Sequence, residues 1–264
     1  MKVRSIEFNL AVQGSGVPLI WGHGLMGSMA GEDQYNFLDW PSIGKSATVI
    51  RYDARGHGGS QPSDDPADYS WPSLSQDMAG IMEALGHSRY LAGGQSMGCA
   101  TTLYTGRAKP DRVKGMILMN PPTAWETRAA QSSVYDTMAR AVETGGIDRL
   151  VQLMKDSPSV IEWLVKERPD LAESGIENIA KFDPHTLVTI LKGAKLSNFP
   201  PREEIAAIRI PALILAWVGD PVHPVETADS LHALLPDSTL IVAENLQDVL
   251  TWSDRIREFI ETCR

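Results

Sequence analysis

The sequence predicts an α/β protein with a mostly parallel central sheet flanked by helices, and two observations carry this prediction. Short apolar runs alternate with amphipathic helical patterns along most of the 264 residues. Several of these runs are almost continuously apolar, which is typical of strands buried on both faces of a parallel sheet. Glycine-rich loops follow several runs, and ligands in such folds bind beyond the carboxyl ends of the strands.

The expected elements follow one another in a regular order. Strands are expected in the runs VPLIW (17–21), SATVIRYD (46–53), RYLAGG (89–94), VKGMILM (113–119), IPALILAWV (210–218) and STLIVAE (238–244). Helices are expected in WPSLSQDMAGIMEALGH (71–87), CATTLYTGRAKP (99–110), VETADSLHALLP (225–236) and TWSDRIREFIETC (251–263). Gly86 ends the first of these helices, because glycine tolerates the left-handed backbone of a helix terminus.

One stretch interrupts this alternation. Residues 122–201 contain only helical patterns, and about eighty residues are too many for an ordinary crossover between two strands. We therefore expect a core formed by residues 1–121 and 202–264, with residues 122–201 inserted as a helical cap or lid over the strand ends. Apolar residues of the insertion, including Trp163, either line a substrate pocket or form the core of the cap.

Composition and charge narrow the class of partner. The formal net charge is −9 and no basic cluster is present, which argues against nucleic acid as a partner. No run resembles a signal peptide or a membrane span, and only two cysteines occur, Cys99 and Cys263, so a cytoplasmic location is expected. No Cys/His cluster has the spacing of metal ligands, and neither a metal nor an organic cofactor is expected. A homodimer is compatible with the sequence, which carries no signal for oligomeric state.

A nucleophile turn is the strongest functional signal. The motif G-x-S-x-G occurs as Gly94-Gln95-Ser96-Met97-Gly98, after an expected strand and before an expected helix. This context makes Ser96 a candidate nucleophile at a helix N-terminus, where an oxyanion is stabilised. The backbone N–H groups of Met97 and of Leu25, in the earlier loop WGHGLMGS, are the candidate oxyanion donors.

These motifs together resemble the α/β-hydrolase superfamily. The resemblance rests on HGLMGS, YDARGHGGS, GQSMG and the GD that follows PALILAWV, in that order, and it extends over essentially the whole chain. It implies an α/β-hydrolase fold, a cap that shapes the substrate pocket, and a structural role for Asp53 and His57. It also implies the order serine, acid, histidine, in which Asp220 matches the acid.

The resemblance also exposes a gap, because the base is absent from its usual place. A histidine is expected 25 to 29 residues beyond the acid, where Asn245 to Val249 stand. His223, in GDPVHP, is the one histidine whose loop must leave the carboxyl edge of the sheet beside Ser96. We therefore predict a relocated base, His223, oriented by Asp220 or alternatively by Asp248 or Glu244. The remaining histidines fit other positions better: His23, His57, His87, His185 and His232.

Two functions follow from this constellation. The first is a carboxylesterase-like serine hydrolase that cleaves small carboxylic esters or lactones through an acyl-enzyme, without a cofactor. The second is a non-hydrolytic relative, such as a ligand receptor, a lyase or a carbon–carbon bond-cleaving enzyme that uses the pocket and the oxyanion hole. Three residues are candidate substrate contacts: His23, which otherwise braces its loop, Trp125 at the hinge of the insertion, and Trp163.

Overall fold

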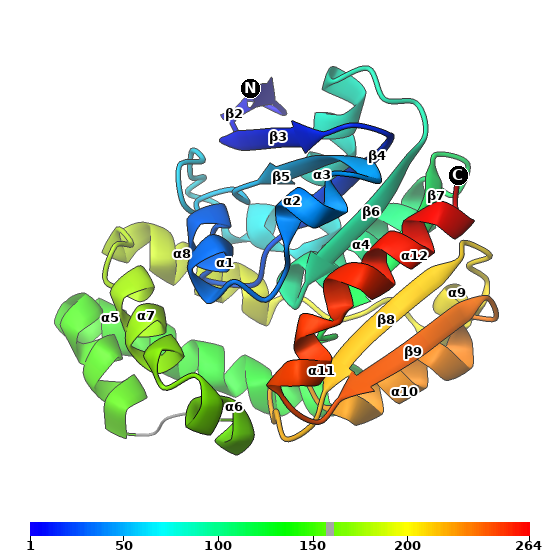
Figure 1. The fold of residues 1–264 in the computed structure, drawn as a ribbon. Helices are drawn as coiled ribbons and strands as arrows, with labels where there is room; N and C mark the ends of the chain where they lie inside the picture. The colour runs from blue at the N-terminus through cyan, green and yellow to red at the C-terminus, as the bar shows by residue number, and fades with distance from the viewer. Residues whose placement is uncertain (157–160) are drawn as a thin grey trace.

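A twisted, mostly parallel sheet forms the centre of the molecule (Figure 1). In the computed structural model, which describes residues 1–156 and 161–264, the seven strands of this sheet follow the order β3-β5-β4-β6-β7-β8-β9. Neighbouring strands from β5 to β9 pair in parallel, and β3 pairs antiparallel with β5 at one edge. The strands are β3 (Leu10–Gly14), β4 (Val17–Gly22), β5 (Ala47–Tyr52), β6 (Tyr90–Gln95), β7 (Val113–Met119), β8 (Ala212–Trp217) and β9 (Ser238–Ala243). The expected α/β class is confirmed, and each of the six expected apolar runs contains a strand.

The N-terminal strands are the part of the sheet that the sequence analysis did not find. β1 (Lys2–Val3) and β2 (Ile6–Glu7) form a small antiparallel pair, and β3 is largely exposed. These strands carry a weak apolar signal because they are short or lie at an edge of the sheet. Backbone pairing of β3 with β5, from Leu10 opposite Tyr52 to Gly14 opposite Thr48, holds that edge instead.

Helices cover both faces of the sheet and bury its apolar side chains. α3 (Trp71–Ala84), α4 (Met97–Ala108), α9 (Arg202–Ala206) and α10 (Val225–Leu234) contribute to the core on one face. α2 (Trp40–Ile43) and α12 (Trp252–Thr262) contribute to the core on the other. Successive residues of a strand point to opposite faces, so Ile20 joins the first core whereas Leu19 and Trp21 join the second.

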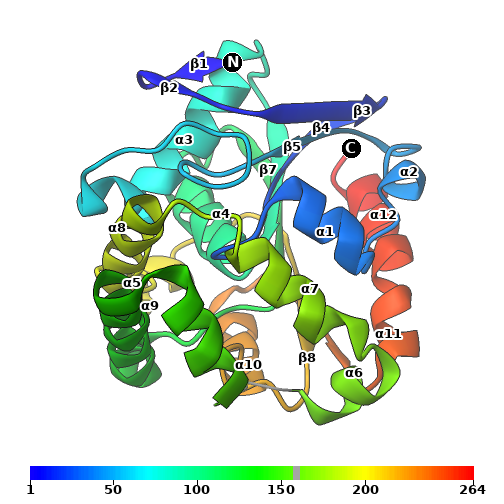
Figure 2. The ribbon, with the colours of Figure 1, turned by 90° about the vertical axis from the view of Figure 1, so that its left-hand side faces the viewer.

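The described part of the chain between β7 and β8 is largely helical, as expected. It contains η2 (Trp125–Thr127), α5 (Arg128–Asp156), α6 (Glu162–Glu167), α7 (Asp170–Ile179) and α8 (Pro184–Lys195). The backbone of α5 breaks at Gly145 and Gly146. Residues 157–160, within the segment 122–201 that was expected to be helical, lie outside the described residues. Figures 1 and 2 show α5 to α8 gathered at one end of the molecule.

The apolar cluster of these helices reaches the core domain at one loop. Buried side chains of α5, α7 and α8, including Tyr135 and Met138, pack against one another. Leu25 and Met26, in the loop that follows β4, pack against the same cluster. The helical segment therefore rests on the loop that the sequence analysis assigned to the oxyanion hole.

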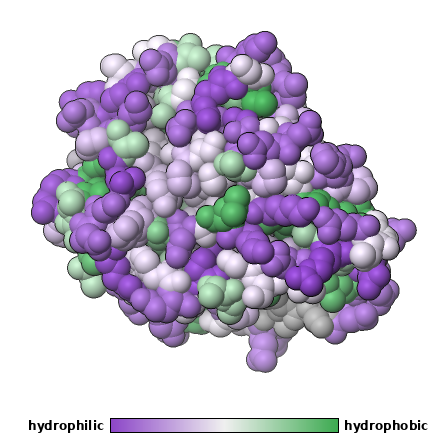
Figure 3. Space-filling model, turned by 180° about the vertical axis from the view of Figure 1, so that it is seen from behind, coloured by the Kyte–Doolittle hydropathy of each residue, from purple (hydrophilic) through white to green (hydrophobic). Residues whose placement is uncertain are grey.

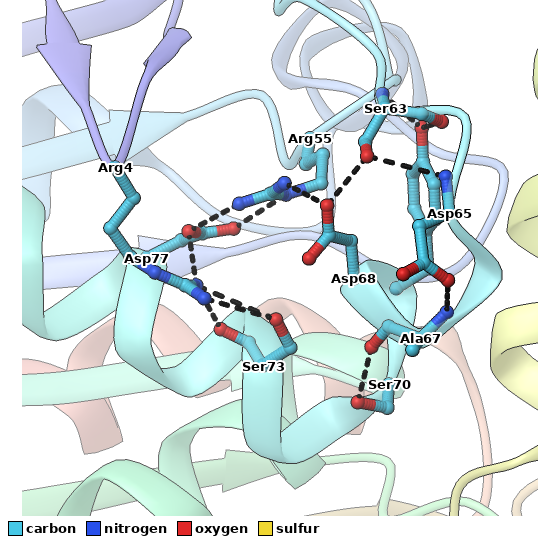
Figure 4. Close-up of polar contacts among 10 residues, drawn as sticks. Arg4, Arg55, Ser63, Asp65, Ala67, Asp68, Ser70, Ser73 and Asp77 are labelled. Carbon is cyan, nitrogen blue, oxygen red and sulfur yellow. Dashed lines mark hydrogen bonds and ion pairs between the residues drawn. The ribbon is translucent and has the colours of Figure 1, made fainter.

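A buried ion-pair network holds the loop that follows β5 (Figure 4). Arg55 donates two hydrogen bonds to Asp77 of α3, at 3.0 and 2.9 Å, and one to Asp68 at 2.8 Å. Arg4, in the turn between β1 and β2, donates to the same Asp77 carboxylate at 2.7 Å. Arg55 and Asp77 are 3% and 1% exposed, so each charge depends on its partner in place of water.

The surface opposite the view of Figure 1 is mostly hydrophilic, with hydrophobic residues scattered among polar ones (Figure 3). Large exposed apolar side chains include Val12, Val134, Leu196 and Leu250, which come from separate elements. Isolated residues of this kind are normal on a protein surface. Within the described residues, every helix is too short or too polar to cross a membrane.

Candidate active site

Ser96 occupies a sharp turn between β6 and α4. Its backbone has φ 54° and ψ −110°, a left-handed conformation that a non-glycine residue rarely adopts. The turn is packed so tightly that a Cβ at Gly98 would overlap the carbonyl oxygen of Gly22 in β4. A Cβ at Gly94 would also crowd that oxygen. The turn therefore requires glycine two residues before and two residues after Ser96. Its strained backbone directs the Ser96 side chain away from the end of β6.

The structure brings Ser96, His223 and Asp220 into one hydrogen-bonded chain. His223 Nε2 lies 2.8 Å from Ser96 Oγ, and His223 Nδ1 lies 2.7 Å from Asp220 Oδ2. The His223 and Asp220 side chains are 15% and 7% exposed. With Asp220 ionised, Nδ1 carries the proton that the carboxylate accepts, and Nε2 is left to accept the Ser96 hydroxyl proton. Both residues come from the single loop between β8 and α10.

Asp220 is held on both of its oxygens. Oδ1 accepts the backbone N–H groups of Val222 and His223, and Oδ2 accepts Trp217 Nε1–H at 2.8 Å besides His223 Nδ1–H. Burial by itself would raise the pKa of Asp220. The hydrogen bond and charge of His223, together with the hydrogen bonds of Trp217 and Val222, lower the pKa of Asp220 to about 2 instead. The carboxylate is therefore ionised at neutral pH.

The loop in which the histidine was first expected serves as a helix N-terminus. Asn245 caps α11 (Leu246–Leu250) by accepting the backbone N–H of Asp248 at 3.1 Å. Asp248 Oδ2 in turn accepts the backbone N–H of Glu244 at 2.9 Å. These reciprocal bonds form a capping arrangement, so the alternative orienting carboxylate Asp248 is engaged with its own loop while Asp220 contacts His223.

The two backbone N–H groups predicted to bind an oxyanion belong to residues near Ser96. Gly24 lies beside Ser96, since a Cβ at Gly24 would be 4.0 Å from Ser96 Oγ. The next residue, Leu25, offers an N–H that donates to no other described residue. Met97 is the first residue of α4, and its N–H is one of the orphan donors of a helix N-terminus. Both predicted donors therefore belong to residues adjacent to Ser96 or Gly24, and Met97 lies at the positive end of α4.

Two buried histidines brace the loop that carries Leu25. His23 is 1% exposed; its Nδ1–H donates to Gly24 O at 2.7 Å and its Nε2 accepts Ala54 N–H at 2.9 Å. His57 Nε2 accepts Met26 N–H at 3.3 Å, and its Nδ1–H donates to Arg55 O at 2.8 Å. Burial lowers the pKa of His23, and it lowers the pKa of His57 to about 3, so both rings are neutral. Neither His23 nitrogen is left to contact a substrate.

The two tryptophans proposed as substrate contacts lie in different surroundings. Trp125 donates its Nε1–H to Pro200 O at 3.0 Å, and the Arg202 guanidinium lies 4.3 Å from its ring centroid. These contacts place Trp125 where the helical segment leaves and rejoins the core. Trp163, in α6, donates its Nε1–H to Val218 O at 2.9 Å and therefore contacts the loop that carries Asp220.

The remaining histidines have other partners. His185 is exposed beside Asp64, His232 of α10 contacts Ser238, and His87 lies at the amino end of β6. In the described part of the chain, no three His, Cys, Asp or Glu side chains converge as a metal site. The contact that sequence reasoning missed is Trp217 on Asp220; a tryptophan three residues before the candidate acid is its only sequence signal.

The fold and this arrangement correspond to a known class. The family model described as the alpha/beta hydrolase fold matches residues 17–249. The chain therefore belongs to the α/β-hydrolase family, as the motifs around Ser96 suggested.

Sequence identity to individual relatives is low. Proteins named "Putative carbamate hydrolase RutD" from Pseudomonas savastanoi pv. phaseolicola and Pseudomonas syringae pv. syringae are each 24% identical to this chain. The two alignments cover 89% and 97% of this chain, and 92% and 98% of the relatives.

Solved structures share the fold. An enol-lactonase from Burkholderia xenovorans has a TM-score of 0.78 at 19% identity, over 98% of this chain and 96% of its own. A thermophilic esterase from Thermogutta terrifontis has a TM-score of 0.80 at 22% identity, over 98% and 94%.

Proposed function

We propose that this protein is a serine hydrolase that cleaves small carboxylic esters or lactones through an acyl-enzyme, with His223 as a relocated general base. The observation that carries the proposal is the hydrogen-bonded chain from Ser96 Oγ through His223 to Asp220, with contacts of 2.8 and 2.7 Å. Serine, imidazole and carboxylate in this arrangement are the groups that nucleophilic acyl transfer requires.

The proposed reaction assigns one role to each of these groups. Ser96 Oγ attacks the carbonyl carbon while His223 Nε2 takes the hydroxyl proton, and Asp220 stabilises the resulting imidazolium through Nδ1–H. The Leu25 and Met97 N–H groups bind the oxyanion of the tetrahedral intermediate. His223 then protonates the departing alkoxide, which leaves Ser96 acylated. A water molecule, deprotonated by the same imidazole, hydrolyses the acyl-enzyme and restores the serine.

The helical segment α5 to α8 is proposed to act as the cap of this site. Its apolar cluster packs on Leu25 and Met26 beside the oxyanion donors, and Trp163 contacts the loop of Asp220. A cap in this position excludes water and limits the size of the acyl group. The proposed core is residues 1–121 and 202–264, with residues 122–201 as the cap.

The scissile group need not be a simple ester. The relatives named as carbamate hydrolases make a carbamate a further acyl donor to test, since attack by Ser96 on its carbonyl would give a carbamoyl-enzyme by the same steps. A substrate panel should therefore contain p-nitrophenyl acetate, p-nitrophenyl butyrate, γ-butyrolactone and a p-nitrophenyl carbamate.

The test combines active-site labelling with turnover. A fluorophosphonate should label the wild type on Ser96, and p-nitrophenyl acetate should release a burst of nitrophenol. Ser96→Ala should abolish the label. His223→Ala should lower kcat by up to about a million-fold, the loss seen when a serine protease loses its histidine.

His185→Gln is the matched control for loss of a histidine, because His185 is exposed beside Asp64. It should retain wild-type labelling and turnover. An unlabelled wild type that turns over no member of the panel would refute the hydrolase proposal and favour the alternative, a non-hydrolytic binding or lyase function in the same pocket.

A further inference from the structure

The Asp220 carboxylate accepts a fourth hydrogen bond, from the indole of Trp217. Trp217 Nε1–H donates to Asp220 Oδ2 at 2.8 Å, and the same oxygen accepts His223 Nδ1–H at 2.7 Å. Trp217 is the last residue of β8 and lies only three residues before the acid. The backbone bonds of Oδ1 hold one oxygen, and the indole holds the other. The plane of the carboxyl group is thereby determined.

The indole that donates this bond is itself held rigidly. Trp217 is 4% exposed and stacks on Trp252 of α12, with ring centroids 5.8 Å apart and an angle of 24° between the rings. Phe37 and Trp163 meet the Trp217 ring edge-on at 5.6 and 6.2 Å. A ring fixed on three sides points its N–H in one direction, so little rotational freedom remains in the bond to Asp220.

The orientation of the Asp220 carboxylate affects Ser96 through two further contacts, Asp220 to His223 and His223 to Ser96. Oδ2 must face Nδ1 for the imidazole to present Nε2 to Ser96, and the 2.7 and 2.8 Å contacts are made in that orientation. Because acid and base share one loop here, the loop backbone cannot orient them independently of each other. The indole comes from the strand, outside that loop, and supplies a fixed reference for the carboxylate.

We propose that Trp217 is a positioning residue for the His223 base, acting through its N–H···Oδ2 hydrogen bond to Asp220. The inference rests on the proposed function, in which His223 activates Ser96. It adds a residue outside the serine–histidine–aspartate set and assigns it a definite atom, Nε1. The competing explanation is that Trp217 is only an aromatic side chain of the core.

Trp252 offers a matched control for that competing explanation. It is 0% exposed, stacks on the same ring, and its Nε1 has no hydrogen-bond partner among the described residues. Trp217→Phe and Trp252→Phe therefore remove the same atoms from the same stack, but only the first removes a donor to Asp220. A purely structural role predicts comparable effects on turnover from the two variants.

The experiment measures turnover, labelling and the hydrogen-bonded proton in both variants. Trp217→Phe should lower kcat for p-nitrophenyl acetate about tenfold with KM within about twofold, because the lost bond orients the base and does not bind substrate. Fluorophosphonate labelling of Ser96 should slow by a similar factor. The downfield proton resonance of His223 Nδ1–H, identified by its absence in His223→Gln, should shift. Trp252→Phe should change kcat less than about twofold and leave that resonance in place.

A second substitution separates the hydrogen bond from the shape of the ring. Replacement of Trp217 by β-(3-benzothienyl)alanine puts sulfur where the indole has N–H and preserves the stack, so it remains informative if Trp217→Phe folds poorly. It should reproduce the tenfold loss. Wild-type turnover in the benzothienyl variant, or equal losses in Trp217→Phe and Trp252→Phe, would overturn the inference while labelling of Ser96 in the wild type still supported the hydrolase. An unlabelled wild type would instead overturn the proposed function.

Discussion

Replacement of Asp220 by asparagine tests the proposed mechanism at its most specific point, the tautomer of His223. Oδ1 of Asp220 accepts two backbone N–H groups, from Val222 and His223. An asparagine carbonyl oxygen must take that position, because an NH2 group there would face two donors. The NH2 group would then point at His223 Nδ1 and Trp217 Nε1, where the carboxylate accepts two bonds. His223 would be forced to carry its proton on Nε2, from which it cannot accept the proton of Ser96.

The expected size of this effect follows from the same geometry. The corresponding tautomer reversal in a serine protease costs about 10⁴-fold in kcat, or about 5.5 kcal/mol of transition-state stabilisation. We therefore expect Asp220→Asn to reduce kcat for p-nitrophenyl acetate by about 10⁴-fold. The measurement is steady-state turnover at pH 7 together with the rate of fluorophosphonate labelling of Ser96.

Asp248→Asn is the matched control, because Asp248 is the rival carboxylate and its bond from Glu244 N–H needs only an acceptor oxygen. An asparagine can keep that bond, so turnover should stay within about twofold of wild type. An Asp220→Asn variant that retains more than a tenth of wild-type turnover would contradict the proposed tautomer, and so would an Asp248→Asn variant that loses as much as Asp220→Asn.

Three further predictions concern the framework of the site, and urea unfolding measures each of them. Gly98→Ala should destabilise the fold by about 3 kcal/mol, since its Cβ would overlap the carbonyl oxygen of Gly22; an unchanged midpoint would contradict the packing of the turn. Arg55→Met should cost about 3–5 kcal/mol, because it leaves the Asp77 charge buried with fewer partners; a loss below 1 kcal/mol would be inconsistent with a buried pair. Burial raises the pKa of Glu32 from 4.5 to about 7, so its ionisation should remove about 2–3 kcal/mol of wild-type stability as the pH rises from 5 to 8. Glu32→Gln should not show this loss, and parallel pH profiles of the two proteins would argue against a buried, titrating carboxyl group.

Strand prediction succeeded where burial produced a pattern in the sequence. The runs that became β4 to β8 are largely buried by helices on both faces of the sheet and are therefore nearly all apolar. β9 lies at the edge and is only partly buried, but its apolar, β-branched run still predicted a strand. β1 to β3 escaped prediction because they are short or exposed and are held by backbone pairing, which leaves little trace in side-chain type.

The candidate site also contains features that the sequence predicts and features that it does not. Glycines at 94 and 98 mark the turn of Ser96 because no other residue fits there, and this requirement is visible in the motif itself. The segment that lacks the expected histidine contains Asn245 and Asp248, whose side chains are typical of helix N-termini. In the structure they form such an N-terminus, at the start of α11. His23 is held by hydrogen bonds to Gly24 and to Ala54. Ala54 lies in the loop that follows β5, 31 residues along the chain, so no local sequence pattern predicts this contact.

The α/β class, the family, the turn that carries Ser96 and the short list of candidate bases could be predicted from the amino-acid sequence. Those features can be read from short stretches of sequence: the spacing of apolar residues, the glycines two residues before and after Ser96, and the positions of the six histidines. Three contacts could be seen only in the folded chain: His223 reaches Ser96 at 2.8 Å, Asp220 and not Asp248 contacts His223, and Trp217 donates a hydrogen bond to the Asp220 carboxylate. Hydrogen bonds of this kind are set to within a few tenths of an ångström by how β6 and β8 are spaced across the sheet, and residues 127 positions apart carry no local sequence signal of that spacing.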